Sequence, residues 1–303
     1  MKVLRHRGLG CLLGLAVGDA VGTTLEFKTP GSFQPIQDMM GGGPFRLEKG
    51  QWTDDTAMAL CLGQSLAECR GFDANDQMQR YSRWQSDGYM SCTGHCFDVG
   101  VTVSRALIKY SKTGDPFAGS TDPLSSGNGA LMRLAPIPLF YAFSHELAVQ
   151  MAAESTRTTH GSLMCTDSSR LFCDLLLRAM SARHKEEVFF TQYHGVTDEI
   201  RDLLNWDFLN QPMGNMTGTG FVIDSLKSAL WCFWHGNSYR ESVLMAANLG
   251  NDADTTAAIC GQIAGAYYGV GGIPDEWLDA LWWREEITAL GDRLLDAAVR
   301  RAA

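Results

Sequence analysis

Residues 8–22 read Gly-Leu-Gly-Cys-Leu-Leu-Gly-Leu-Ala-Val-Gly-Asp-Ala-Val-Gly, an apolar run in which glycine recurs at every fourth position from Gly10 to Gly22. Positions four apart lie on the same face of an α-helix, so these glycines would form one flat face. A face without side chains lets another backbone approach closely. A second ladder of small residues, also spaced by four, runs from Ala257 to Gly269. Both stretches predict helices that pack at short range.

The N-terminal run has an alternative interpretation. Basic residues precede the apolar residues 8–17, as they do in a secretory signal peptide. The acidic residues Asp19 and Glu26 follow at once, however, and a signal peptide has no need of a glycine ladder. We therefore favour a helix of the folded domain. No other stretch is long and apolar enough to span a bilayer, so we expect no membrane association.

The composition is that of a soluble globular protein, with 45% hydrophobic and 19% charged residues among 303. A formal net charge of -9 and the lack of a basic tract argue against a nucleic-acid-binding surface. The nine cysteines are scattered, odd in number and form no CxxC pair, which indicates a reducing compartment. We therefore expect a cytoplasmic protein, and we expect a monomer.

Apolar residues recur three or four positions apart, as in helices, along most of the chain. The stretches with this spacing are residues 55–70, 76–87, 98–112, 129–143, 146–154, 162–182, 219–235, 239–248, 255–268 and 276–300. Only residues 187–192 alternate as a β-strand would, and neither a repeat nor a low-complexity linker divides the chain. The sequence therefore predicts an all-α fold, a single orthogonal helical domain over residues 1–303.

Two acidic clusters each open one of these apolar stretches. Residues 53–56 read Thr-Asp-Asp-Thr, and residues 252–256 read Asp-Ala-Asp-Thr-Thr. Either cluster alone can be interpreted as a helix cap with favourable acids in the first turn. Two clusters with paired acids and adjacent threonines favour a shared cation site, because crowded carboxylates repel one another unless cations lie between them.

The donor atoms of the two clusters indicate the kind of metal. All of them are carboxylate or hydroxyl oxygens, and no histidine or cysteine lies nearby in the sequence. Oxygen-only sites bind Mg²⁺, Mn²⁺ or Ca²⁺ rather than zinc. Four carboxylates match the charge of two divalent cations, which suggests a dinuclear site with ions ~3.5–4 Å apart.

Further motifs, taken in order with the acidic clusters, make the sequence similar to the ADP-ribosylglycohydrolase family, and within it to the dinitrogenase reductase-activating glycohydrolase type. The motifs are Gly14-Leu15-Ala16-Val17-Gly18-Asp19-Ala20, Glu26-Phe27, Gly41-Gly42-Gly43, Gln51-Trp52-Thr53-Asp54-Asp55-Thr56, Phe97-Asp98-Val99-Gly100, Gly127-Asn128-Gly129-Ala130, Thr159-His160 and Asp252-Ala253-Asp254-Thr255-Thr256. The resemblance runs nearly from end to end, and the ordered set is specific although no single motif is.

The resemblance implies an all-helical fold that holds two Mg²⁺ or Mn²⁺ ions and hydrolyses the glycosidic bond between ADP-ribose and an acceptor. The substrate would be an ADP-ribosylated protein, with arginine the usual acceptor in the bacterial branch, and the product would be free ADP-ribose. The family's metal ligands would fall on Thr53, Asp54, Asp55, Asp252, Asp254 and Thr255.

The resemblance also implies a set of catalytic acids. Asp98 matches the acid of the family's Asp-Ile/Val-Gly motif and is expected to do acid–base or ribose-orienting work, unless it is only the N-cap of the following helix. Glu26 matches a glutamate near the ribose and the metals, unless it is a plain solvated charge. Asp55 and Asp254 would combine catalysis with metal binding. We interpret Asp19 as a buried polar group bonded to backbone.

A glycine-rich turn ahead of an apolar stretch is the expected phosphate cradle. The amides of Gly127, Asn128 and Gly129 at a helix start would face an anion, although Gly-Asn-Gly is also a common turn. His160 would contact the diphosphate or the ribose, or would only mark a helix boundary. Phe221 falls where the family places an aromatic residue near the adenine, but it could equally belong to the core.

Other functions stay open at this point. The acidic clusters would also suit a two-metal phosphoester hydrolase, a relative acting on an O-linked or nucleic-acid ADP-ribosyl acceptor, or a non-catalytic binding member such as a toxin-immunity protein. Val101 and Gly161 stand where the family more often has other residues, which leaves the acceptor open. The complete ligand set, together with Asp98 and Glu26, favours a catalytic member.

Overall fold

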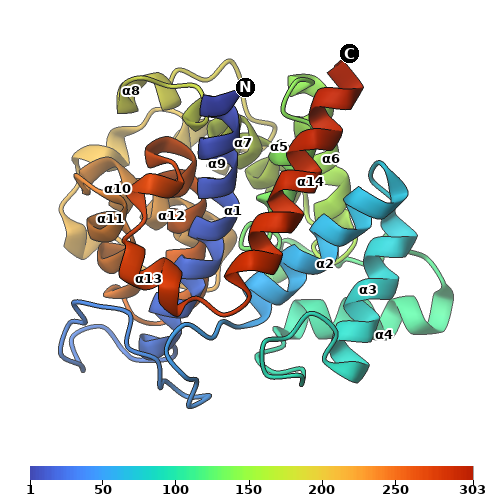
Figure 1. Cartoon of the computed structure of the whole chain (residues 1–303), viewed down its shortest axis with the longest axis horizontal. Coiled ribbons are helices and arrows are strands. Elements are labelled where there is room, and N and C mark those ends of the chain that lie inside the picture. The colour runs from blue at the N-terminus through green and yellow to red at the C-terminus, as the bar shows by residue number, and fades with distance from the viewer. Residues whose placement is uncertain (303) are drawn as a thin grey trace.

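The structure of the protein, a computed structural model, describes residues 1–302. It consists of α-helices and short 3₁₀ helices joined by loops (Figure 1), and no β-strand occurs in this range, which confirms the all-α prediction. The α-helices are α1 (Lys2–Gly22), α2 (Asp54–Cys69), α3 (Ala74–Asp87), α4 (Val101–Thr113), α5 (Pro136–Phe140), α6 (His145–Arg157), α7 (Leu163–Ala179), α8 (Lys185–Val188), α9 (Asp198–Leu203), α10 (Val222–His235), α11 (Tyr239–Ala247), α12 (Ala253–Tyr268), α13 (Asp275–Ala280) and α14 (Arg284–Ala302). The 3₁₀ helices are η1 (Thr23–Leu25), η2 (Pro123–Ser125), η3 (Asp207–Asn210), η4 (Met213–Asn215) and η5 (Val270–Gly272).

Helices α1 and α12 pack against each other at the centre of the fold (Figure 1), and their two glycine ladders face each other. A Cβ atom placed on Gly14 would lie 2.3 Å from the carbonyl oxygen of Gly261. One placed on Gly265 would lie 1.9 Å from the carbonyl oxygen of Gly10. Only hydrogen fits at such distances, so the two backbones are in direct contact. The contact extends to Gly22, where the last turn of α1 meets the first turn of α12.

The stretch that resembles a signal peptide is the central helix of this structure. By length and composition, the segment Lys2–Leu25 could cross a membrane, yet 89% of its most apolar window is buried inside the fold. Helix α12 covers its glycine face, and α14 and α2 also pack against it. The segment therefore has the packing role that its glycine ladder predicts.

Replacing Gly14 with valine should destabilise the protein strongly. A side chain there meets backbone of α12 at 2.3 Å, so relief requires the two central helices to separate. Overpacking typically costs about 1–3 kcal/mol, and we expect the upper end because the obstacle is backbone. Chemical denaturation followed by circular dichroism measures the loss. Gly214→Val is the matched control, because a Cβ there meets nothing within 4 Å. Equal stability of the two variants would contradict the close packing.

Residues 129–143 do not form one helix, contrary to the sequence prediction. Turns occupy the first part of the stretch, and only α5 is helical. Proline has no N–H to donate to a preceding turn, so a helix from residue 129 cannot continue past Pro136, whereas Pro136 and Pro138 both fit in the first turn of a helix that begins there. The segment ahead of α5 therefore remains an irregular turn, and this turn carries the glycine-rich motif.

Three other predicted elements are wrong in their bounds or type. Residues 276–300 form two helices, α13 and α14, separated where Trp283 adopts a φ of 58°. Residues 187–192 contain the end of the short helix α8 and then irregular backbone instead of a strand. The helix expected from position 98 begins at Val101, because Asp98 has a φ of 59°, outside the right-handed helical region.

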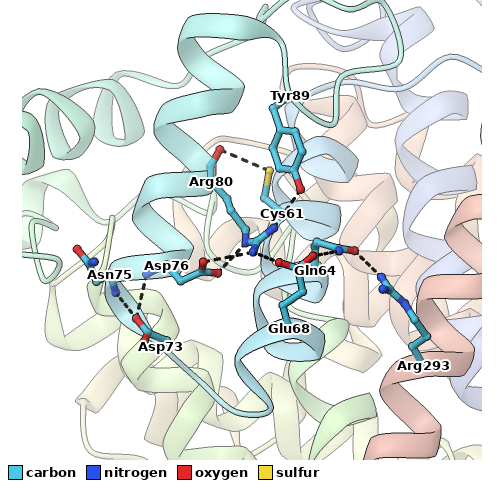
Figure 2. Close-up of polar contacts among 9 residues, drawn as sticks. All are labelled: Cys61, Gln64, Glu68, Asp73, Asn75, Asp76, Arg80, Tyr89 and Arg293. Atoms are coloured by element: carbon cyan, nitrogen blue, oxygen red, sulfur yellow. Dashed lines mark hydrogen bonds and ion pairs between the residues drawn. The ribbon is translucent and has the colours of Figure 1, made fainter.

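A network of charged and polar side chains ties α2 to its neighbours (Figure 2). Arg80 of α3, whose side chain is 9% exposed, donates to Glu68 of α2 at 2.5 Å and to Asp76 of its own helix at 2.6 Å. Gln64 of α2 donates to Glu68 and accepts from Arg293 of α14. These contacts fix the C-terminal half of α2, and with it the orientation of the helix whose first turn carries an acidic cluster.

Candidate active site

The structure brings the two acidic clusters together where the first turns of α2 and α12 meet. The Thr53 hydroxyl lies 3.3 Å from Oδ2 of Asp254, which is 201 residues later in the chain. The Thr255 hydroxyl lies 3.2 Å from Oδ1 of Asp55. Asp54 is buried beside them. The packed glycine ladders produce this arrangement, because they set the start of α12 against the end of α1.

Asp19 of α1 caps α2 in place of that helix's own acids. Its carboxylate accepts hydrogen bonds from the amides of Thr53 at 2.9 Å and Thr56 at 3.0 Å. It also accepts from the hydroxyls of these two threonines, at 2.9 and 2.6 Å. Asp19 is therefore a buried polar group bonded to backbone, as interpreted from the sequence. The carboxylates of Asp54 and Asp55 are left free of capping.

Glu26 has the same role at α12. Its Oε2 accepts from the amide of Ala253 at 2.8 Å and from that of Asp254 at 3.3 Å. Asp252, the N-cap residue, makes no capping bond through its side chain. Glu26 is 4% exposed, so its interpretation as a solvated charge is wrong. Because Asp19 and Glu26 cap the two helices, the clusters are not ordinary helix caps.

Seven carboxylates gather here without a basic partner. They are Asp19, Glu26, Asp54, Asp55, Asp98, Asp252 and Asp254. In the described chain, none of them forms an ion pair with lysine, arginine or histidine. Burial of unbalanced charge is costly, so this cluster must hold protons or bind cations.

The electrostatics of the cluster agree with that conclusion. Burial raises the pKa of Asp54 and of Asp55 well above the usual range, and repulsion from neighbouring acids adds to the effect. Burial, with the charge of Asp254 as the next cause, raises the pKa of Asp252 to about 7. Burial also raises the pKa of Asp98 to about 7 and that of Asp254 to about 6.

The donor set fits hard divalent cations. Carboxylate oxygens of Glu26, Asp252 and Asp254 all lie within 4.8 Å of one another. Oδ2 of Asp55 is buried and has no hydrogen-bond partner in the described residues. Carboxylates and hydroxyls are the ligands that Mg²⁺, Mn²⁺ and Ca²⁺ accept. The residues placed to hold cations are Thr53, Asp54, Asp55, Asp252, Asp254 and Thr255, and Glu26 joins them although the sequence suggested a catalytic role for it.

A cavity of about 680 Å³ adjoins the acidic cluster. Glu26, Asp54, Asp98, Asp252, Asp254 and Thr255 line it together with Gly127, Asn128, Gly129 and His160. Thr53 and Asp55 are not among the lining residues, because they lie behind the wall in contact with Asp254 and Thr255. One cavity therefore joins the candidate metal ligands to the glycine-rich turn.

Asp98 lies in the cavity wall with its backbone in the left-handed region. Its φ of 59° is one that aspartate adopts more readily than most other residues. The N-cap of α4 is Gly100, so the alternative of Asp98 as a helix cap is wrong. Its carboxylate lies within hydrogen-bond reach of the Asp254 carboxylate, so the two acids can share a proton at the cavity wall.

The glycine-rich turn differs from the predicted cradle. It does not start a helix, and the amides of Gly127 and Asn128 already donate to Ser125 and Gly220. The Asn128 side chain donates to Oδ2 of Asp252 at 2.7 Å, so it links the turn to the acidic cluster. In the described part of the chain, the amides of Gly129 and the next residue have no acceptor. Gly129 lines the cavity, so its amide is the part of the turn that can bind an anion.

Comparison with known proteins decides the family. A family model for ADP-ribosylglycohydrolase matches residues 1–303. The chain belongs to the ADP-ribosylglycohydrolase family. The resemblance seen in the sequence is thereby confirmed.

Two curated relatives of this glycohydrolase have names that state an activity. It is 37% identical over 292 residues to ADP-ribosylarginine hydrolase Tri1 of Pseudomonas putida (strain GB-1), covering 96% of this chain and 78% of the relative. It is 32% identical over 288 residues to the ADP-ribosyl-[dinitrogen reductase] glycohydrolase of Rhodospirillum rubrum, covering 92% and 91%. A solved structure titled ADP-ribosylglycohydrolase-related protein complex is 41% identical, with a TM-score of 0.87 over 98% of this chain and 100% of that one. The protein is therefore an enzyme, an ADP-ribosyl hydrolase rather than a phosphoester hydrolase.

Of the two remaining residues that were predicted to bind substrate, one lines the cavity and the other does not. His160 is 2% exposed and lines the cavity. Phe221 does not line the cavity and is 38% exposed, so it is not a core residue. Its backbone pairs with that of Gly127, which places it beside the glycine-rich turn.

Sequence reasoning missed one residue of this glycohydrolase. Arg133 is 1% exposed and donates from Nη1 to the carbonyl oxygen of Gly129 at 2.6 Å. The only signal in the sequence was a single arginine in an otherwise apolar stretch, four residues after the last glycine of the turn.

Proposed function

We propose that this glycohydrolase removes ADP-ribose from arginine side chains of proteins by hydrolysing the N-glycosidic bond. The relative named ADP-ribosylarginine hydrolase Tri1, at 37% identity, supports arginine as the acceptor. We further propose that two divalent cations, Mg²⁺ or Mn²⁺, bind in the acidic cluster. ADP-ribosylated protein is then the substrate and free ADP-ribose the product.

One observation carries the proposal. The cavity joins buried carboxylates without basic partners to a wall of hydrogen-bond donors at Gly129 and His160. ADP-ribose has the matching polarity, because its ribose hydroxyls suit a cation site and its diphosphate suits donors. A volume of about 680 Å³ is in the range of small-molecule and cofactor sites.

The chain's own residues supply the remaining chemistry. Hydrolysis needs a water directed at the anomeric carbon and a proton for the departing nitrogen. Asp98 lines the cavity and shares a hydrogen bond with Asp254, so it can exchange a proton with the water or the leaving group. Glu26 is held by the amides at the start of α12, so its carboxylate keeps a fixed direction. Divalent cations bound by Asp54, Asp55, Asp252 and Asp254 would supply a Lewis acid for the ribose hydroxyls and for water.

The proposal is tested by incubating the enzyme with ADP-ribose linked to arginine, to serine and to nucleic acid, and by identifying the products with mass spectrometry. We expect free ADP-ribose from the arginine-linked substrate, and we expect Mg²⁺ or Mn²⁺ to be required. Release of ADP-ribose from only the serine-linked or the nucleic-acid-linked substrate would contradict arginine as the acceptor. Release that is unaffected by EDTA would overturn the cation requirement.

We also propose that the enzyme acts as a monomer in the cytoplasm, without binding nucleic acid. The scattered free cysteines and the net charge of -9 support these proposals. Light scattering coupled to size-exclusion chromatography tests the oligomeric state, and a mass of about twice 33.2 kDa would overturn it.

A further inference from the structure

Arg133 is a buried cation without a counter-ion. Its guanidinium lies behind the glycine-rich turn, 1% exposed, and no carboxylate pairs with it in the described chain. Its hydrogen bonds go to the carbonyl oxygen of Gly129 and to the hydroxyl of Thr159, and it stacks 4.9 Å from the centre of the Tyr81 ring. Its Nε is buried with no partner among the described residues. Every group around this charge is therefore neutral.

The hydrogen bonds of Thr159 fix the protonation of His160. Arginine has no acceptor, so the bond of 2.7 Å between Nη2 of Arg133 and the Thr159 oxygen uses a proton of arginine. The only other partner of this hydroxyl in the described chain is Nδ1 of His160, at 2.8 Å. A buried hydroxyl proton needs an acceptor, and Nδ1 is the one that this hydroxyl has in the described chain, so the arrangement favours a Thr159 proton that points to an unprotonated Nδ1. A neutral His160 then carries its proton on Nε2.

The Nε2–H of His160 faces the cavity. A Cβ on Gly129 would lie 3.2 Å from Nε2 and one on Gly127 would lie 3.4 Å from it, so this nitrogen is next to the glycine-rich turn. No acceptor for Nε2 is present within residues 1–302. Burial, together with the charge of Arg133, lowers the pKa of His160 to about 3, so the ring stays neutral at physiological pH.

Arg133 also orients the turn itself. Its bond to the Gly129 carbonyl turns that oxygen toward the guanidinium. In a planar trans peptide, the following N–H points in the opposite direction, so the Ala130 amide points away from Arg133. Ala130 is 3% exposed, and its amide has no acceptor in the part of the chain that the structure describes. Arg133 therefore holds the peptide after Gly129, a residue of the cavity wall, in one orientation.

We propose that Arg133 is a positioning residue for the diphosphate of the substrate: it fixes His160 as the Nε2–H tautomer, orients the turn, and attracts negative charge from behind Gly129. The diphosphate is the part of ADP-ribose that suits this wall, because the acidic cluster would repel it. The inference rests on the proposed function for the identity of the ligand, whereas the tautomer is a property of the free protein.

The tautomer is tested first, in the free protein. Long-range ¹H–¹⁵N correlation spectra show which ring nitrogen of His160 carries the proton, and we expect Nε2 alone in the wild type. Thr159→Val removes the hydroxyl at nearly constant volume and should yield a mixture of tautomers. Thr166→Val is the matched control, because this buried hydroxyl bonds to backbone carbonyls of α7 and does not contact His160. If His160 remains entirely the Nε2–H tautomer in Thr159→Val, the Thr159 hydroxyl does not set the tautomer.

Ligand positioning is tested by calorimetric titration with ADP-ribose. Arg133→Met should weaken binding about ten- to hundredfold, and in turnover it should raise KM more than it lowers kcat. Arg157→Met is the control, because Arg157 also stacks on an aromatic ring, 4.4 Å from the centre of Phe117, but its guanidinium donates to Glu154 instead of to Gly129 and Thr159. Stabilisation of Arg133→Met by Mg²⁺ shows that the fold and the acidic cluster are intact. If Arg133→Met does not fold, Thr159→Val is titrated instead, and we expect it to bind ADP-ribose about tenfold more weakly.

The outcomes separate the inference from the proposed function. If the wild type binds ADP-ribose and both variants bind it equally well, the role of Arg133 is overturned while the function stands. If the wild type does not bind ADP-ribose but His160 is the Nε2–H tautomer, the proposed function fails and the structural role of Arg133 is supported.

Discussion

Replacing Asp54 and Asp254 together with asparagine should reduce the release of ADP-ribose about 10⁴-fold or more while the protein stays folded. The two residues lie in the first turns of α2 and α12, and each contributes a buried carboxylate to the cluster. Asparagine keeps the shape but removes the charges that cations require. Rates of ADP-ribose release at saturating Mg²⁺ or Mn²⁺ measure the loss.

The same double variant should also lose the stabilisation of the folded state by divalent cations. Cations that bind only the folded wild type stabilise it by about 2.7 kcal/mol at a hundred times their dissociation constant. This stabilisation should disappear in the variant, whereas the cation-free variant should be as stable as the wild type or more so, because two repelling buried charges are gone. Asp198→Asn with Asp279→Asn is the control, since both of these acids are exposed. A cation-induced rise in melting temperature equal to that of the wild type would contradict the site.

Asp98→Asn should lower kcat by about 10²- to 10⁴-fold, the usual contribution of a general acid or base, with little change in KM. Asparagine tolerates the positive φ of this position, so the backbone should be retained. Steady-state kinetics measure the split between kcat and KM. Binding of ADP-ribose and stabilisation by Mg²⁺ should be unchanged. If the stabilisation by Mg²⁺ is lost instead, Asp98 is a ligand of the cations rather than an acid–base residue.

Much of the fold is readable from the sequence because helices leave a local signal. The apolar spacing of residues 55–70 predicts α2 to within one residue at each end. The glycine spacing from Gly10 to Gly22 predicts close backbone contact, which the structure confirms against α12. The acidic residues can be recognised as a group because charge repulsion between them does not depend on the details of packing.

The remaining features depend on contacts between distant segments and leave no local signal. Nothing around Asp19 or Glu26 in the sequence shows that they cap helices that begin at positions 54 and 253. The role of Asn128 as a link to Asp252 likewise appears only once α12 is in place. Pro136 is a local signal that a new helix begins there. The apolar spacing continues on both sides of this proline, however, so the sequence predicted one helix instead of a turn followed by α5.

The pairing of α1 with α12 also has a consequence for synthesis of the chain. Helix α1 leaves the ribosome long before its main partner, which begins only at Ala253 and ends at Tyr268. Until then the apolar N-terminal helix has no cover for its glycine face, and native contacts of this sequence separation form slowly. Both capping acids lie in the segment that contains α1, and Glu26 is 227 residues ahead of Ala253, so the acidic cavity is completed only after α12 has been made. During that interval the nascent chain exposes an apolar helix, which favours aggregation.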